Sequence, residues 1–173
     1  SLQKRIQKIK LLVLDADGVL TDGRIIYDSD GREIKNFDVR DGFALVLFQE
    51  LGFKTAILTA RFSKVLSLRA QDLKINRLYQ NAYPKGKAYQ KLLKDFRLKN
   101  EDVCFVGDDL PDLPVLKRVG FAVAVADAVP EVKKAAHYVT KKRGGKGAVR
   151  EVVELILKTQ GMWGALTARF DHG

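Results

Sequence analysis

Short apolar runs alternate with longer amphipathic segments along most of the chain, and this alternation predicts strands separated by helices. The apolar runs predict strands at residues 11–14, 53–60, 77–80, 102–109 and 121–126, with a short edge strand at 137–140. Helices are predicted from an N-cap at Asp41 to Leu51, over residues 63–73, after Pro84 and over 147–159. Such a chain folds as an α/β protein, in which a parallel sheet lies between two layers of helices.

One segment interrupts this alternation directly after the first strand. Residues 24–37 carry two strand-like runs on either side of Ser29-Asp30-Gly31. An Asp-Gly pair between such runs is a strong signal for a β-hairpin, so we expect a hairpin insertion that projects from the edge of the sheet. No repeat or linker divides the sequence, and we expect one domain over residues 1–173 with a tail from about 161 to 173.

Composition and charge limit the kinds of environment and binding partner that we expect for this chain. The chain has 173 residues, of which 46% are apolar, enough for one domain with a sizeable core. A single cysteine, Cys104, excludes an intrachain disulfide and fits a reducing, cytoplasmic environment. No apolar stretch is long enough to span a membrane. The net charge of +10 favours anionic partners, which include nucleic acids, anionic lipids and phosphorylated small molecules.

Four of the predicted strands lead into residues that can carry chemistry. In a parallel sheet the carboxyl ends of the strands meet at one edge, so these side chains should lie close together. In chain order the residues are Asp15 and Asp17, Thr59 and Arg61, Lys85, and then Asp108, Asp109 and Asp112.

This set of residue types favours phosphoryl transfer at a magnesium site. Carboxylate oxygens are the ligands of a hard ion such as Mg²⁺, and the only histidines, His137 and His172, are not at these strand ends, which argues against zinc. One carboxylate can attack phosphorus. Thr59 and Lys85 would then supply a hydroxyl group and a positive charge for the phosphoryl oxygens.

The order of these motifs resembles the haloacid dehalogenase superfamily of phosphotransferases, whose sheet is Rossmann-like. The resemblance implies that Asp15 is the nucleophile and that Asp17 is the general acid and base. It also implies that Mg²⁺ is held by the Asp15 carboxylate, the Asp17 backbone carbonyl and Asp108. Two further acids would orient the active-site lysine and metal-bound water: Asp109 and Asp112.

Further segments narrow the resemblance to the 3-deoxy-D-manno-octulosonate 8-phosphate (KDO 8-phosphate) phosphatases. They are DGVLTDG, the hairpin in place of a large cap, FDVRDG (37–42), TAR (59–61) and the run 123–157, and the likeness covers roughly residues 8–160. It implies a capless phosphatase that releases KDO and phosphate for lipopolysaccharide biosynthesis. It also implies a homotetramer in which the hairpins pack together and a neighbouring subunit covers each active site, with no nucleic-acid or membrane partner.

The same resemblance implies a set of substrate contacts. Arg40 would face the carboxylate or hydroxyls of the sugar acid, while Asp38 and Ala60 depart from the asparagine and glycine expected at their positions. The glycine-rich stretch 141–151 would lie near a subunit interface, and the tail could reach a neighbour's site. The candidate substrate-binding residues are Asp17, Asp38, Val39, Arg40, Asp41, Gly42, Thr59, Ala60, Arg61, Arg69 and Lys85.

Three other functions share some of these features. A phosphatase for the nine-carbon acid 2-keto-3-deoxynononate 9-phosphate would use the same chemistry, and the sequence does not separate the two substrates. A receiver-type phospho-acceptor module also uses clustered acids, a threonine and a lysine, but its acceptor closes the third strand, where this chain has no acid. A nucleic-acid-binding protein would leave the buried acids unexplained.

Overall fold

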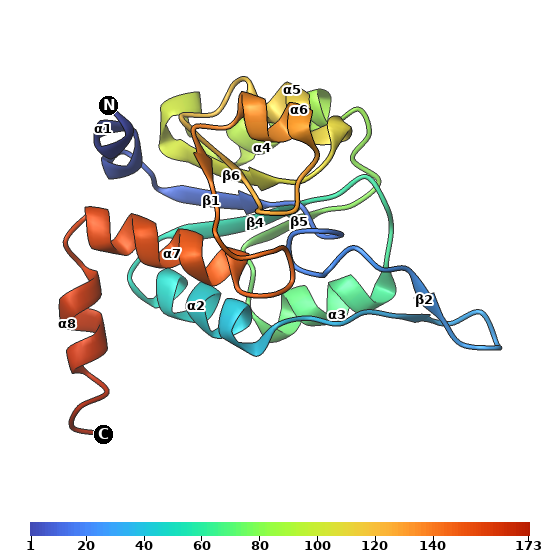
Figure 1. Cartoon of the computed structure of the whole chain (residues 1–173), viewed down its shortest axis with the longest axis horizontal. Helices are drawn as coiled ribbons and strands as arrows, with labels where there is room; N and C mark the ends of the chain where they lie inside the picture. The colour runs from blue at the N-terminus through green and yellow to red at the C-terminus, as the bar shows by residue number, and fades with distance from the viewer.

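A six-stranded sheet forms the centre of the computed structural model, which describes all residues from Ser1 to Gly173. Every neighbouring pair of strands is parallel, and their order across the sheet is β5-β4-β1-β6-β7-β8 (Figure 1). The strands are β1 (Leu11–Leu14), β4 (Lys54–Leu58), β5 (Arg77–Tyr79), β6 (Val103–Gly107), β7 (Phe121–Ala124) and β8 (Tyr138–Val139). All six fall within the predicted runs.

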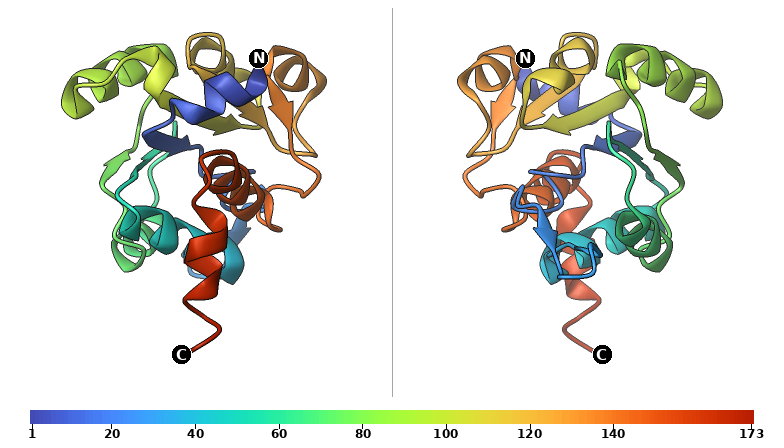
Figure 2. Two further views of the ribbon diagram at one scale, coloured as in Figure 1. Left: turned by 90° about the vertical axis from the view of Figure 1, so that its left-hand side faces the viewer. Right: turned by 90° about the vertical axis from the view of Figure 1, so that its right-hand side faces the viewer.

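Helices cover both faces of the sheet (Figures 1 and 2). One layer holds α2 (Val39–Glu50), α3 (Lys64–Asp72) and α7 (Ala148–Thr159), and the other holds α4 (Lys85–Phe96), α5 (Leu113–Leu116) and α6 (Pro130–Ala135). This arrangement confirms the predicted α/β fold in three layers. The remaining helical segments are α1 (Leu2–Gln7), α8 (Trp163–Ala168) and the short 3₁₀ helices η1 (Asn100–Asp102) and η2 (Leu110–Asp112). No helix has both the length and the apolar character that crossing a bilayer requires.

Strand β1 is fully enclosed at the centre of the sheet. Its four residues, Leu11 to Leu14, have no exposed surface, because β4 and β6 pair with its two edges and helices cover both faces. The chain leaves β1 toward β4 on one side of the sheet and later returns to β6 on the other. The carboxyl end of β1 is therefore the switch point of the sheet, where α/β proteins bind their ligands.

The predicted hairpin is present and projects away from the sheet (Figure 1). Its strands β2 (Ile26–Tyr27) and β3 (Glu33–Ile34) pair antiparallel. The Asp28 carboxylate closes the turn by accepting hydrogen bonds from the backbone N–H groups of Asp30 and Arg32.

The start of α2 differs from the prediction that Asp41 is its N-cap. Asp38 caps the helix instead, since its Oδ1 accepts from the N–H groups of Arg40 (2.8 Å) and Asp41 (2.9 Å). Asp38 therefore satisfies N–H groups that the helix itself leaves free. Asp41 lies inside the first turn, where its Oδ1 accepts from the N–H of Arg150 at the start of α7.

The glycine-rich loop at residues 141–147 lies against the turn that follows β1. Gly145 N–H donates to Val19 O (2.9 Å), and Gly144 N–H donates to Asp127 Oδ1 (2.9 Å). A Cβ added to Gly144 would lie only 1.7 Å from Gly18 O. Glycine is therefore required where this loop touches the turn that carries the candidate catalytic acids.

Candidate active site

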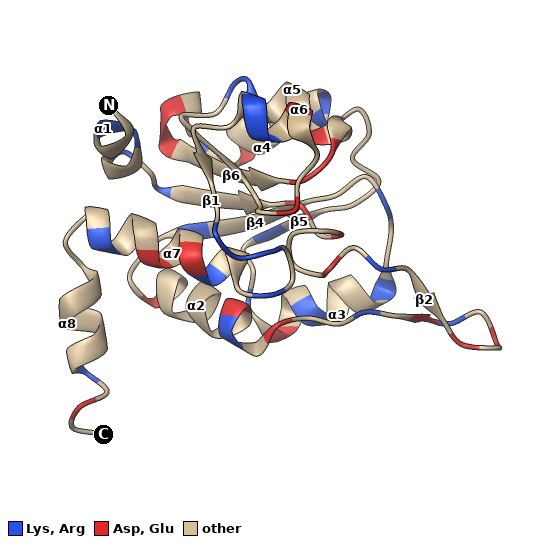
Figure 3. Cartoon of the chain, in the orientation of Figure 1, with Lys and Arg blue, Asp and Glu red and all other residues tan.

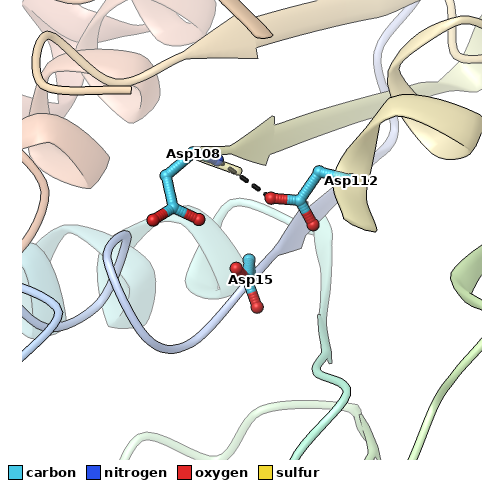
Figure 4. Close-up of side chains that lie close together, drawn as sticks. All are labelled: Asp15, Asp108 and Asp112. Atoms are coloured by element: carbon cyan, nitrogen blue, oxygen red, sulfur yellow. Dashed lines mark hydrogen bonds between the residues drawn. The ribbon is translucent and has the colours of Figure 1, made fainter. Parts of the chain in front are cut away.

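Three carboxylates converge at the carboxyl edge of the sheet. Asp15 directly follows β1, Asp108 directly follows the neighbouring strand β6, and Asp112 lies at the end of η2. One oxygen of each lies within 4.8 Å of the others, and all three side chains point into the same space (Figure 4). The sequence predicted this meeting from the positions of the acids at the strand ends.

Two glycines make room for these carboxylates. Gly18 has a φ of +90°, and a Cβ there would lie 1.9 Å from Asp108 Oδ2. A Cβ on Gly107 would lie 2.7 Å from Asp112 Oδ2. Each glycine lets a carboxylate approach the backbone more closely than any side chain would permit.

Lys85 forms ion pairs with two of the acids, Asp15 and Asp112. It is the first residue of α4 and is 3% exposed, and its Nζ lies 3.0 Å from Asp15 Oδ1 and 2.5 Å from Asp112 Oδ1. Burial opposes the charge of this lysine, but attraction to Asp15 and Asp112 outweighs burial and raises the pKa of Lys85 above its ordinary value. The lysine is thus held as a cation inside the site.

One lysine does not neutralise three acids. Burial, followed by repulsion from Asp112, raises the pKa of Asp15 to about 6. Burial, followed by repulsion from Asp15, raises the pKa of Asp108 to about 9. Both carboxyl groups would ionise fully at neutral pH only if a further cation entered the site.

The donor set fits a hard divalent cation. All available ligand atoms are oxygens, and no histidine or cysteine side chain belongs to the cluster. Burial and mutual repulsion raise the pKa of both Asp15 and Asp108, and a bound cation would oppose both effects. Oxygen-only ligation by carboxylates suits Mg²⁺. Asp112 is already engaged by Lys85 and by the N–H of Asp108 (2.9 Å), which leaves Asp15 and Asp108 as the freer ligands.

Asp109 does not contact the lysine, contrary to the expectation that it helps to orient Lys85. Its side chain is turned to the surface and accepts a hydrogen bond from Leu110 N–H (2.8 Å) at the start of η2. Of Asp109 and Asp112, only Asp112 contacts Lys85. Asp112 also precedes α5, but its side chain makes no cap hydrogen bond to that helix.

Asp17 lies in a separate ring of charges. Its Oδ1 is 2.5 Å from Lys35 Nζ, and its Oδ2 is 2.9 Å from Arg61 Nη1. Glu33 closes the ring, with Oε2 2.6 Å from Arg61 Nη2 and Oε1 3.4 Å from Lys35 Nζ. Hydrogen bonds from Ser63 and Arg61 outweigh burial and lower the pKa of Glu33 below its ordinary value.

The sequence did not identify Glu33 and Lys35 as functional. Both residues lie in the hairpin, where alternating charged residues are typical of a solvent-exposed strand face. The available signal was their spacing, because residues two apart in an extended segment point to the same side. Here that side faces Asp17.

Thr59 is placed at the same edge of the sheet as the acids. It follows β4, which pairs with β1, and it is 3% exposed. The Thr59 backbone is hydrogen-bonded to the loop after β5, because its carbonyl oxygen accepts from Ala82 N–H (2.9 Å). Ala60 follows it, and Arg61 reaches the ring around Asp17.

The other predicted substrate contacts do not join the cluster around Asp15. Arg40 and Asp38 line a groove of about 600 Å³ beside α7, together with lysines of the 141–146 loop. Asp41 is 1% exposed and is therefore not accessible to a ligand in this chain, while Val39 is 79% exposed. These placements follow from the start of α2 at Val39, which turns successive residues to different sides.

Arg69 and Gly42 form a contact of their own. The Arg69 guanidinium lies 5.6 Å from the centre of the Phe37 ring, and a Cβ on Gly42 would lie 2.2 Å from Arg69 Nη2. Within one chain, Arg69 therefore packs on the segment that leads into α2 and does not reach Asp15. Figure 3 shows the resulting charge distribution, with acids at the ends of the central strands and basic residues along the 141–146 loop.

Comparisons with known proteins agree with this geometry. A sequence model of the haloacid dehalogenase-like hydrolase family matches residues 43–152. The chain is 46% identical over 157 residues to the 3-deoxy-D-manno-octulosonate 8-phosphate phosphatase KdsC of Yersinia pestis, covering 91% of this chain and 84% of that protein. The same phosphatase of Escherichia coli K12 is 45% identical, with the same coverage.

Solved structures give the same result. A probable phosphatase from Pseudomonas syringae superposes with a TM-score of 0.97 at 44% identity, covering 99% of this chain and 98% of that one. The 3-deoxy-D-manno-octulosonate 8-phosphate phosphatase from Moraxella catarrhalis, in complex with magnesium ion, phosphate ion and KDO, superposes with a TM-score of 0.95 at 39% identity. That comparison covers 98% of this chain and 97% of the other.

Proposed function

Because this chain belongs to the haloacid dehalogenase-like hydrolases, and within them to the KDO 8-phosphate phosphatases, we propose that it hydrolyses KDO 8-phosphate to KDO and phosphate. The observation that carries the proposal is the convergence of Asp15, Asp108, Asp112 and Lys85 at the switch point of the sheet. The same cluster supports magnesium as the cofactor, because its ligands are oxygens and Lys85 balances only part of their negative charge.

Asp15 and Asp17 have different roles in the proposed reaction. A carboxylate oxygen of Asp15 attacks phosphorus and forms an aspartyl phosphate, while the bond from phosphorus to the sugar oxygen breaks and Asp17 gives that oxygen a proton. In the second step Asp17 takes a proton from water, which attacks phosphorus, releases phosphate and restores the Asp15 carboxylate. Lys85 fixes the direction of Asp15 through its contact with Oδ1.

Positive charge must balance the phosphoryl oxygens during transfer. Asp15, Asp108 and the backbone carbonyl of Asp17 would hold magnesium, which would supply positive charge when it is bound. Lys85 would add a further positive charge, and the Thr59 hydroxyl would donate a hydrogen bond to a phosphoryl oxygen. The carboxylate of the sugar acid would be met by basic residues near the site, for which Arg61 is the candidate that lies beside Asp17.

The test is phosphate release from KDO 8-phosphate with Mg²⁺, with EDTA, and with Mg²⁺ restored. We expect activity that EDTA abolishes and Mg²⁺ returns. Asp15→Asn should fold and lose at least about 1,000-fold in kcat, because the nucleophile is gone. Asp30→Asn, at the exposed hairpin turn, is the matched control and should remain active. Substantial hydrolysis by Asp15→Asn would exclude the aspartyl-phosphate mechanism.

The nine-carbon substrate, 2-keto-3-deoxynononate 9-phosphate, would be attacked by the same groups, and the two acids differ in chain length and hydroxyl pattern. The relatives from Yersinia pestis and Escherichia coli support the eight-carbon acid. Values of kcat/KM measured side by side should favour KDO 8-phosphate, and the reverse order would reassign the substrate.

The proposal extends to the assembly and the setting of the enzyme. We propose a homotetramer in which hairpins pack together and a neighbouring subunit covers each active site, acting in the cytoplasm in lipopolysaccharide biosynthesis. Exposed apolar side chains on the hairpin support it, since Ile25, Tyr27 and Ile34 are each about half exposed in the single chain. Arg69 and the exposed residues Val39 and Arg40, which do not reach Asp15 of their own chain, would then be available to a neighbour.

A further inference from the structure

The hairpin places one buried cation directly on the proposed general acid and base. The side chain of Lys35 is 2% exposed, and its Nζ has two partners, Asp17 Oδ1 at 2.5 Å and Glu33 Oε1 at 3.4 Å. A lysine is almost never buried without such partners, because removing its charge from water is costly. The shorter of its two contacts is the one to Asp17.

The ring of four charges fixes the Asp17 carboxylate in two directions. Lys35 holds Oδ1, while Arg61 holds Oδ2 from the loop after β4. Each carboxylate oxygen has a second lone pair, so both remain able to carry a proton. These two contacts therefore hold the Asp17 side chain in one orientation and leave it able to transfer a proton.

Lys35 is not explained by hairpin formation alone. Strands β2 and β3 pair through residues 26–27 and 33–34, and Arg32 and Asp28 close the turn through their own ion pair at 2.7 Å. Lys35 lies after the paired segment and reaches back 18 residues to Asp17. Its contact thus joins the base of the hairpin to the turn after β1, which carries Asp17.

We propose that Lys35 is a positioning residue, which acts through Asp17 to place the proton that the leaving alcohol receives. This inference rests on the proposed phosphatase function and adds a residue to it. The sugar oxygen is a poor leaving group and needs that proton as its bond to phosphorus breaks. A good leaving group departs without it.

The difference between leaving groups provides the test. For substituted phenyl phosphates of similar size, kcat/KM reports the steps up to release of the phenol and excludes hydrolysis of the aspartyl phosphate. In Lys35→Met we expect a loss below about 3-fold for 4-nitrophenyl phosphate and at least about 30-fold for phenyl phosphate. The dependence of log kcat/KM on the pKa of the phenol should therefore steepen. Lys117→Met, which removes an exposed lysine without an ion pair, should leave that dependence unchanged.

A double-mutant cycle separates positioning from general damage. In the Asp17→Asn background the Lys35→Met change should cost less than about 2-fold with phenyl phosphate, because the group it positions is already absent. Equal losses for all leaving groups, no loss at all, or full additivity with Asp17→Asn would each overturn the role of Lys35. Should Lys35→Met fail to fold, Lys35→Gln is measured in the same way. Failure of the wild-type chain to hydrolyse KDO 8-phosphate would count against the proposed function, whereas an active wild type with an unchanged dependence in Lys35→Met would count only against this inference.

Discussion

At the scale of single residues, Gly18 controls whether Asp108 can occupy its place. Gly18→Ala introduces a methyl group 1.9 Å from Asp108 Oδ2, in a backbone conformation of φ +90° that alanine seldom adopts. We expect Gly18→Ala to displace Asp108, weaken Mg²⁺ binding and reduce kcat by at least about 10-fold. Phosphate release measured against Mg²⁺ concentration checks this.

Gly31 is the matched control for Gly18. It has a φ of +79° but no atom within 4 Å of an added Cβ. Gly31→Ala should cost about 1 kcal/mol of stability through the backbone alone and leave activity intact. Equal activity of Gly18→Ala and Gly31→Ala would show that contact with Asp108 does not matter.

Asp41 makes stability depend on pH. Burial raises the pKa of its carboxyl group from 3.8 to about 6, and its Oδ2 has no hydrogen-bond partner. Between these values the folded chain binds more protons than the unfolded chain, so this group contributes stability as pH falls below 6. Its ionisation opposes folding at neutral pH.

The comparison with Asp41→Asn isolates this effect. The free energy of unfolding of the wild type, relative to Asp41→Asn, should rise by about 2 kcal/mol between pH 7.5 and pH 4.5. Urea unfolding of both proteins at several pH values measures it. A difference that does not change with pH would show that Asp41 ionises normally in the folded chain.

At the scale of elements, the loop at 141–147 supports the turn that follows β1. Gly144→Ala places a Cβ 1.7 Å from Gly18 O, so either the loop or the turn must move. We expect a fall in melting temperature and a fall in kcat of at least about 10-fold. Gly164→Ala, in α8, meets nothing within 4 Å and should lower neither, because alanine favours the helix more than glycine does. If Gly144→Ala kept full activity, the loop would not shape the site.

Strand ends explain why so much of the site was predictable. Asp15, Asp108 and Thr59 are set by the topology of a parallel sheet, and that topology follows from the alternation of apolar runs and amphipathic segments. Asp17 and Lys85 belong to motifs whose order along the chain is specific. For these residues, position in the sequence determines position in space.

Side-chain contacts between distant segments were not predictable in this way. Asp38 and Asp41 are both good N-caps, and only the entry direction of the chain decides between them. Lys35 has the pattern of an exposed hairpin residue until the hairpin packs on Asp17. The short terminal helices, α1 and α8, were missed because each has only six residues and depends on packing.

The C-terminal tail, residues 161–173, is a segment whose structure depends on such packing. Trp163 in α8 lies 5.7 Å from the Arg150 guanidinium of α7 and 5.6 Å from Lys158 Nζ, and Leu166 is 2% exposed. Phe170 meets Phe43 of α2 edge to face at 6.0 Å. Arg150 and Phe43 lie 13 and 127 residues from Trp163 and Phe170, so the tail sequence alone carries no sign of these contacts.

At the scale of the whole molecule, the exposed apolar side chains of the hairpin predict the state of assembly. Light scattering should give a mass near four times the 19.4 kDa of one chain. Ile34→Lys, at a side chain 46% exposed in the single chain, should dissociate the assembly and lower activity while each subunit stays folded. Leu2→Lys, at a similarly exposed residue of α1, should leave the mass unchanged. A monomer at micromolar concentration would refute the tetramer.

The order of strands also governs how this chain can fold as it is synthesised. Strand β1 emerges first, yet its partners β4 and β6 end at residues 58 and 107. Until β6 leaves the ribosome, one edge of the most apolar strand stays unpaired, and unpaired edges promote association between nascent chains. The central strand is thus made first and enclosed late, because more than half of the polypeptide must be synthesised before the strand that leads to Asp15 has both of its partners.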